Sequence, residues 1–207
     1  MSSWPEALAP VENLRPASTG PGCRDRGHGC GSDWSDRGGV LAEVCAAGAH
    51  PDLPLFEDHD PETHLIPLAI DCALGRRPAM EIFGEDYDTA DGTCVRDYVH
   101  VCDLADAHLR VLHLLRTRSR SFNVGTGRGY SVREVLDSVR RVSGTDFPIR
   151  VSARRPGDSP KLVADPTRIF SELAWKPRFA DIDAIVATAW KWRQRLPRGY
   201  ADLALEG

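Results

Sequence analysis

Apolar and polar positions follow two different periods along this chain, and their order predicts an α/β protein. Strand-like runs occur at 41–49, where a strand enters a turn of small residues, and at 80–83, 98–101, 121–124 and 148–153. Segments with apolar residues three or four positions apart predict helices at about 63–74, 103–115, 131–139, 165–173 and 181–196. Strands that alternate with helices are typical of this fold class.

Local signals predict where several of these helices begin and end. Ser131 and Glu134 have the spacing of a capping box. Asp165 followed by Pro166 is typical of an N-cap with proline in the first helical position. Gly75 is expected to close the helix that begins near residue 63.

Residues 1–40 differ from the rest of the chain. They are rich in Gly, Pro, Ser, Arg and Asp and have almost no periodic apolar residues, so we expect this segment to be disordered or unrelated to the remainder. Cys23, His28 and Cys30 lie close together there, but no second ligand pair follows at the spacing of a zinc ribbon or finger. The sequence therefore predicts no metal site.

Composition excludes some classes of protein. Hydrophobic content of 42% and charged content of 27% are ordinary for a globular protein, and the formal net charge of −4 disfavours a general nucleic-acid binder. No apolar run approaches the roughly 18 residues of a membrane helix. The start of the chain lacks the pattern of a signal peptide, so we expect its six cysteines to be reduced thiols in the cytoplasm.

The prediction of function depends mainly on the residues of the stretch 83–109. A loop dense in Gly, Asp and Thr leads to Arg96 and Asp97 at the start of a strand. Asp103 is expected to cap the next helix. That helix has an apolar stripe of Leu104, Ala107, Leu109, Val111, Leu112 and Leu115. An arginine beside a long polar loop is typical of an anion site, although composition alone favours an ordinary surface loop with a solvated ion pair.

From about residue 46 to residue 200 the chain resembles the C-terminal half of UDP-glucose 4-epimerases, NAD-dependent isomerases of galactose metabolism in the extended short-chain dehydrogenase/reductase superfamily. The shared motif RDYVHVxDLA occurs widely in that superfamily. DYxTxDGTxVRDY (86–98) together with ARRPGD (153–158) is more specific to the 4-epimerases. Other matching segments are 46–52, 57–68, 122–135 and 189–200. A fragment of another nucleotide-sugar epimerase or dehydratase is the alternative ancestry.

The resemblance implies a UDP-sugar site. In the family the arginine of the VRDY motif, here Arg96, contacts the diphosphate, and so does the second arginine of ARRPGD, here Arg155. The aspartate of that motif, here Asp158, holds a ribose hydroxyl. Two guanidinium groups form a permanently charged clamp that suits a diphosphate.

Four further residues complete the implied site. The main chain around Glu81 and Phe83 would meet the uracil, and His64 and Leu65, at the start of a helix, would line the path of the phosphates. The open N-terminus of a helix adds N–H donors for an anion.

Two positions depart from the family pattern. Cys45 stands where the family has an asparagine that faces the substrate, and Leu162 stands where it has a tyrosine. Both changes remove polar contacts.

The chemistry of the family requires two features that this sequence lacks. One is a glycine-rich turn after the first strand that binds the pyrophosphate of NAD, and the other is a catalytic Tyr-x-x-x-Lys pair. None of the three lysines, at positions 161, 176 and 191, has a tyrosine four residues before it. The turn 125–129 lacks the fingerprint spacing and is predicted to be structural. We therefore expect no catalytic residue in this chain and no NAD bound by it alone.

These features together predict a partial extended short-chain dehydrogenase/reductase fold. It would comprise mainly the small substrate-binding domain and the last strands of the Rossmann sheet, within residues 41–200, followed by a tail at 201–207. Three roles stay open: an inactive member of an enzyme family, one half of a split enzyme completed by a polypeptide carrying the NAD-binding half, or a non-catalytic UDP-sugar-binding protein. Homodimers, as in the family, are a further expectation.

Overall fold

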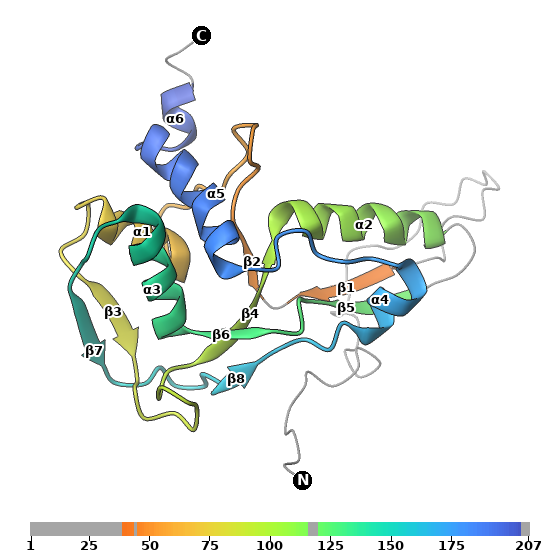
Figure 1. The fold of residues 1–207 in the computed structure, drawn as a ribbon, viewed down its shortest axis with the longest axis horizontal. Coiled ribbons are helices and arrows are strands. Elements are labelled where there is room, and N and C mark those ends of the chain that lie inside the picture. The colour runs from red at the N-terminus through yellow and green to blue at the C-terminus, as the bar shows by residue number, and fades with distance from the viewer. Residues whose placement is uncertain (1–38, 44, 116–119, 204–207) are drawn as a thin grey trace, which may run out of the picture.

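The computed structural model describes residues 39–43, 45–115 and 120–203, and its alternating strands and helices confirm the predicted α/β class (Figure 1). The strands are β1 (Gly39–Glu43), β2 (Cys45–Ala47), β3 (Met80–Phe83), β4 (Val95–His100), β5 (Arg120–Val124), β6 (Gly129–Ser131), β7 (Ile149–Ser152) and β8 (Lys161–Leu162). The helices are α1 (Leu65–Ala73), α2 (Val101–Leu115), α3 (Val132–Ser143), α4 (Thr167–Leu173), α5 (Ile182–Arg195) and α6 (Tyr200–Leu203). No helix in these ranges is both long enough and apolar enough to cross a membrane.

All five predicted strand regions and all five predicted helices are present. The run 41–49 becomes two strands, β1 and β2, on either side of residue 44. The prediction misses β6, β8 and α6, which are short and contain no apolar run or helical spacing of their own. Val101, predicted as the end of a strand, is the first residue of α2.

Strand β4 is the central strand of the sheet that also contains β2, β6 and β8. It pairs in parallel with β2 and β8 and antiparallel with β6. Separately, β1 pairs in parallel with β5, and β3 with β7. This arrangement places both ends of β4 beside segments far away in the sequence, and it places Arg96 opposite Tyr130 and Leu162.

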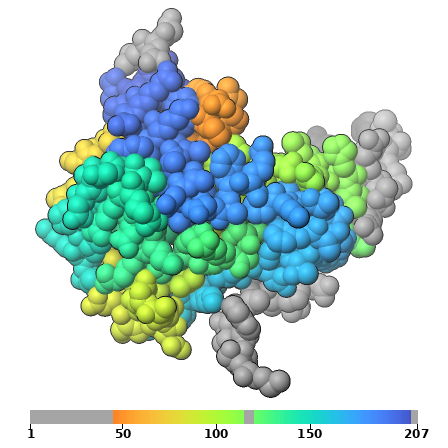
Figure 2. Space-filling model, viewed as in Figure 1, coloured from red at the N-terminus to blue at the C-terminus, as the bar shows by residue number. Residues whose placement is uncertain are grey.

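Three apolar clusters hold these elements together. In the largest, α1, α3 and α5 pack on β3 and β4, and Figure 2 shows the blue C-terminal helices against the green α3. The second joins α2, β5 and α4 around the fully buried Trp175. The third is small, with buried members Ala49, Trp192 and Leu196.

The predicted helix ends are largely confirmed. The Ser131 hydroxyl accepts the N–H of Glu134 at 3.1 Å, and the Glu134 carboxylate accepts the N–H of Ser131 at 2.7 Å. Asp165 accepts the N–H of Thr167 at 3.0 Å, but the predicted start of α4 is wrong by one residue: the helix begins at Thr167, and Pro166 instead of Asp165 occupies the N-cap position. Gly75, just beyond α1, takes the left-handed conformation with φ of 71°.

The prediction for α2 is wrong in two details. Asp103 does not cap the helix, because α2 begins at Val101 and the carboxylate of Asp103 is buried, where it accepts the N–H of Phe179 at 2.8 Å. Leu109 and Leu112 are each 59% exposed, whereas Ala107 and Val111 are buried. The covered face is narrower than the apolar stripe, because α2 packs on β1, β4 and β5 along one side only.

Some predictions concern residues whose structure is not described. Residues 1–38, which contain the Cys23, His28 and Cys30 group, lie outside the described residues, as do 204–207 at the predicted tail. Disorder of the first segment and its lack of a metal site therefore remain predictions.

Candidate functional site

A cavity of about 730 Å³ lies between β2, β3, β4, α1 and α5. The loops 56–64 and 155–158 complete its wall. All seven residues predicted to bind the substrate lie on this wall: His64, Leu65, Glu81, Phe83, Arg96, Arg155 and Asp158. A volume in this range suits a ligand the size of a nucleotide.

Arg96 is fixed by its own strand and by the loop after β7. Its guanidinium donates to the carbonyl oxygens of Val95 at 2.9 Å and Ser159 at 2.8 Å. A further N–H reaches the carboxylate of Asp158 at 3.3 Å, and the side chain is only 16% exposed. The positive charge is therefore preorganised at the wall of the cavity.

Arg154 and Arg155 are adjacent in sequence but face different surroundings. Arg154 pairs with Asp86 at 2.6 Å and lies over the ring of Tyr87. Arg155 lies over the ring of Phe83, with its guanidinium carbon 3.8 Å from the ring centre. Only Arg155 lines the cavity, and the stacked ring restricts where its charge can lie.

Glu81 and Phe83 are brought to the cavity by β3. In the register with β7, Glu81 lies opposite Arg150 and Phe83 opposite Ser152. The Glu81 carboxylate accepts a short hydrogen bond from the Ser152 hydroxyl. This bond ties the end of β7, which leads to Arg155, to the strand that carries Phe83.

The N-terminus of α1 opens onto the cavity through His64 and Leu65. His64 occupies the N-cap position in an extended conformation, and its side chain makes no capping hydrogen bond. Pro67 has no N–H to satisfy in the first turn. The first N–H groups of α1 are thus available to an anion.

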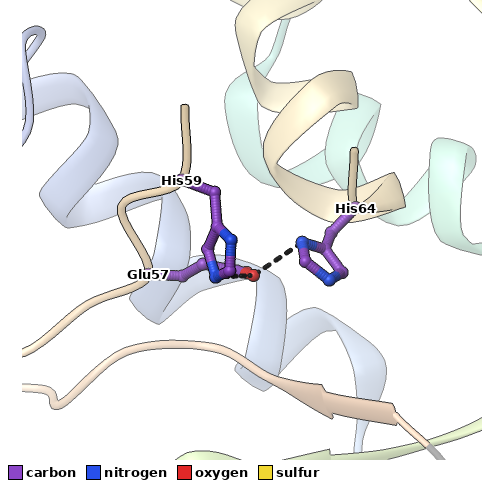
Figure 3. A group of neighbouring side chains, drawn as sticks. All are labelled: Glu57, His59 and His64. Atoms are coloured by element: carbon purple, nitrogen blue, oxygen red, sulfur yellow. Dashed lines mark ion pairs between the residues drawn. The ribbon is translucent and has the colours of Figure 1, made fainter. Parts of the chain in front are cut away.

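Sequence reasoning missed several wall residues. Arg77, Arg193, Glu57, His59 and Glu62 all line the cavity. Figure 3 shows Glu57, His59 and His64 converging from the loop before α1. The only signal in the sequence was the local spacing of acidic and histidine residues in 57–64, which the prediction assigned to a turn and the start of a helix.

The two departures from the family pattern have different positions. Cys45 lines the cavity, and burial raises the pKa of its thiol while the positive charge of Arg96 opposes that shift. Leu162 lies in β8 beside Arg96 and is not on the cavity wall. Only the change at position 45 therefore alters the cavity lining directly.

Tyr98 also lines the cavity, but its environment disfavours a role as a base. Burial raises the pKa of Tyr98 well above its ordinary value, and the Cys45 thiol adds to the shift. The phenol therefore keeps its proton at neutral pH.

The glycine turn 125–129 is held by a buried carboxylate. Asp97 accepts the N–H groups of Thr126 and Gly127, each at 3.0 Å, and the hydroxyl of Thr126 at 2.6 Å. A Cβ at Gly125 would lie 2.5 Å from Asp97 Oδ2. These contacts support the structural interpretation of the turn.

Comparison with known proteins identifies the family of the chain. The family model described as GDP-mannose 4,6 dehydratase matches residues 57–188. The UDP-glucose 4-epimerase of Streptococcus mutans is 47% identical over 82% of this chain and 53% of its own length, and that of Lactobacillus helveticus is 49% identical over the same shares.

Solved structures give the same result. A crystal structure of a UDP-glucose 4-epimerase matches with a TM-score of 0.76 and 44% identity, over 79% of this chain and 50% of its own. The Bifidobacterium longum enzyme in complex with NAD⁺ and UDP matches with a TM-score of 0.74 and 36% identity, over 81% of this chain and 50% of its own. The chain thus spans about half the length of the relatives it matches, and the predicted partial fold is confirmed.

Proposed function

The chain belongs to the nucleotide-sugar enzyme family described as GDP-mannose 4,6 dehydratase and resembles its UDP-glucose 4-epimerases, and from this premise we propose that its cavity binds a UDP-sugar. The observation that carries the proposal is the convergence of Arg96, Arg155 and Asp158 on one wall.

The charges of the cavity suit a diphosphate. Arg96 and Arg155 supply two guanidinium groups, and the N-terminus of α1 supplies N–H donors. Asp158 accepts a hydrogen bond from a ribose hydroxyl when that bond replaces its present contact with Arg96. Phe83, already stacked on Arg155, provides an apolar surface beside the base.

The family uses NAD, and the residues that this structure describes do not fit that cofactor. The one candidate glycine turn, 125–129, has the N–H groups of Thr126 and Gly127 bonded to buried Asp97 instead of being open to a pyrophosphate. The sequence also contains no Tyr-x-x-x-Lys pair. Our proposal is that this chain by itself binds the substrate and does not interconvert UDP-galactose and UDP-glucose.

Calorimetric titration of the purified chain with UDP and UDP-glucose tests the proposal. Saturable binding of both is expected, and GDP is the matched control because it carries the same diphosphate on a different base. Equal affinity for GDP would favour the alternative, a fragment of another nucleotide-sugar epimerase or dehydratase. No binding of UDP at millimolar concentration would reject the proposed site, and turnover of UDP-galactose with added NAD would reject the proposed lack of catalysis.

A split enzyme is the second candidate, favoured by a likeness that covers about half of each relative. In that case an added polypeptide carrying the NAD-binding half of a relative would restore epimerase turnover, whereas this chain with NAD alone would not.

Two further parts of the proposal concern location and assembly. We propose that the chain works in the cytoplasm and that it forms the homodimer expected from the family, which size-exclusion chromatography would reveal.

A further inference from the structure

Glu57, His59 and His64 form a compact group at the edge of the cavity, in the loop that precedes α1 (Figure 3). Their ligand atoms all lie within 4.8 Å of one another. Glu57 Oε1 is 2.7 Å from His64 Nδ1 and 3.5 Å from His59 Nε2. One carboxylate oxygen therefore stands between two imidazole nitrogens.

A second carboxylate reaches the same imidazole. Glu62 Oε1 lies 3.0 Å from His64 Nδ1, so two carboxylates converge on a ring nitrogen that carries at most one proton. The side chain of Glu62 is only 8% exposed, and its Oε2 is buried without a hydrogen-bond partner among the described residues. A carboxylate oxygen that is buried without a hydrogen-bond partner lowers the stability of the folded protein unless a cation or a donor contacts it.

The negative charges of the two carboxylates are not neutralised by the other side chains of this group. Two carboxylates meet two imidazoles that are neutral in their ligand form. Arg193, which lies nearby, is already engaged by Asp71 in a two-pronged pair at 2.7 and 3.0 Å. A divalent cation would balance the two negative charges and take the place of the imidazole protons that face these carboxylates.

We propose that Glu57, His59 and His64 bind a divalent cation of the Zn²⁺ class, with Glu62 beside it as a further carboxylate ligand. Nitrogen and oxygen donors in this combination are the ligands that Zn²⁺ prefers, at about 2.0–2.2 Å. The His59 and His64 side chains are 56% and 52% exposed, so their rings are free to make the small shifts that such distances require. The site shares His64 with the wall of the proposed UDP-sugar cavity, but the metal binds without a nucleotide, so its binding is measured with the metal alone.

Titration of the full chain with Co²⁺, followed by visible absorption, tests the site directly. The expected result is one Co²⁺ per chain with the strong absorption of a four-coordinate centre, displaced by Zn²⁺. His59→Ala, His64→Ala and Glu57→Gln should each weaken binding by about tenfold or more, since even removal of groups that only support a metal's ligands costs about that much.

Two control variants locate the metal. His108→Ala with His113→Ala removes two exposed histidines of α2 and should leave the Co²⁺ spectrum unchanged. Cys23→Ser with Cys30→Ser should do the same, and loss of the spectrum in that variant would overturn the proposal in favour of the N-terminal group. An absent spectrum in the unmodified chain would overturn it outright.

A measurement on the unmodified chain avoids any dependence on the folding of variants. Diethyl pyrocarbonate modifies exposed imidazoles, and mass spectrometry locates the modified histidines. Zn²⁺ should protect His59 and His64 while leaving His108 and His113 reactive. Equal modification of all four with and without Zn²⁺ would refute the site.

Discussion

The guanidinium of Arg96 and the carboxylate of Asp158 lie 3.3 Å apart, although 62 positions separate them in the sequence. The contact joins β4 to the loop after β7 and places a fixed positive charge and a nearby acceptor on the same cavity wall. Because Arg96 also donates to two backbone carbonyls, its substitution would affect folding as well as binding. Substitution of Arg155 therefore tests binding with less effect on folding than substitution of Arg96.

Replacing Arg155 with alanine should weaken UDP binding. A hydrogen bond to a charged group contributes about 1.5–3 kcal/mol, which corresponds to roughly tenfold or more in the dissociation constant. Arg155→Lys should recover only part of the affinity, because lysine keeps the charge and loses the planar fork. Calorimetric titration measures both variants.

Arg141→Ala is the matched control for that experiment. Arg141 pairs with Asp183 at 2.6 Å, is 57% exposed and does not line the cavity. Its loss should leave the affinity for UDP unchanged. If Arg155→Ala and Arg141→Ala bind UDP equally, Arg155 has no part in binding.

Asp97→Ala should destabilise the protein by about 3 kcal/mol, because it removes the fully buried carboxylate that accepts the N–H groups of Thr126 and Gly127 and holds the 125–129 turn. Asp97→Asn should cost less, since an amide retains one acceptor oxygen. Urea unfolding followed by circular dichroism gives the free energy. Asp88→Ala, at an exposed aspartate, should change it by about 0.5 kcal/mol or less. Equal effects of Asp97→Ala and Asp88→Ala would show that the turn does not depend on this carboxylate.

His100 should make stability fall on mild acidification. Its ring is fully buried, its Nδ1 accepts the N–H of Cys102 at 3.1 Å, and its Nε2 lies 3.0 Å from the hydroxyl of Thr188. Nδ1 is thus an acceptor, and burial lowers the pKa of His100 against the opposing charge of Asp103.

The sign follows from this neutral state. The stabilisation that the neutral buried ring of His100 contributes is fully present above about pH 6.5, the pKa of an imidazole in the unfolded chain. It is lost as the pH falls from there through the lower pKa of His100 in the folded protein. Urea unfolding midpoints should therefore decrease between about pH 7 and 5.5. His100→Gln should flatten this dependence, and His113→Gln, which removes an exposed histidine, should not. A steep dependence retained in His100→Gln would assign it to another group.

Cys45 should react slowly with iodoacetamide at neutral pH and faster as pH rises, because burial raises the pKa of its thiol and the thiolate is the reactive form. UDP should protect it, since it lines the cavity. Cys102 is the control: burial also raises the pKa of its thiol, but it lies outside the cavity wall. Mass spectrometry measures both sites. Protection of Cys102 as strong as that of Cys45 would point to a general stabilisation instead of occupancy of the cavity.

The sequence by itself determined the α/β order, the capping box of Ser131 and Glu134, and seven of the residues that line the cavity. Periodicity and capping are local properties, and the family motifs carry the positions of residues that meet only in the fold. For this reason the motifs predict Arg96, Arg155 and Asp158 as members of one site, and the three residues line one cavity.

Only the tertiary structure decided which neighbours each side chain meets. It buried Asp103 against Phe179, and it left Leu109 and Leu112 exposed. It also gathered Glu57, His59 and His64 around one point. A pattern states which residues share a face, but burial and convergence depend on segments far away in the sequence, and no local period encodes those contacts.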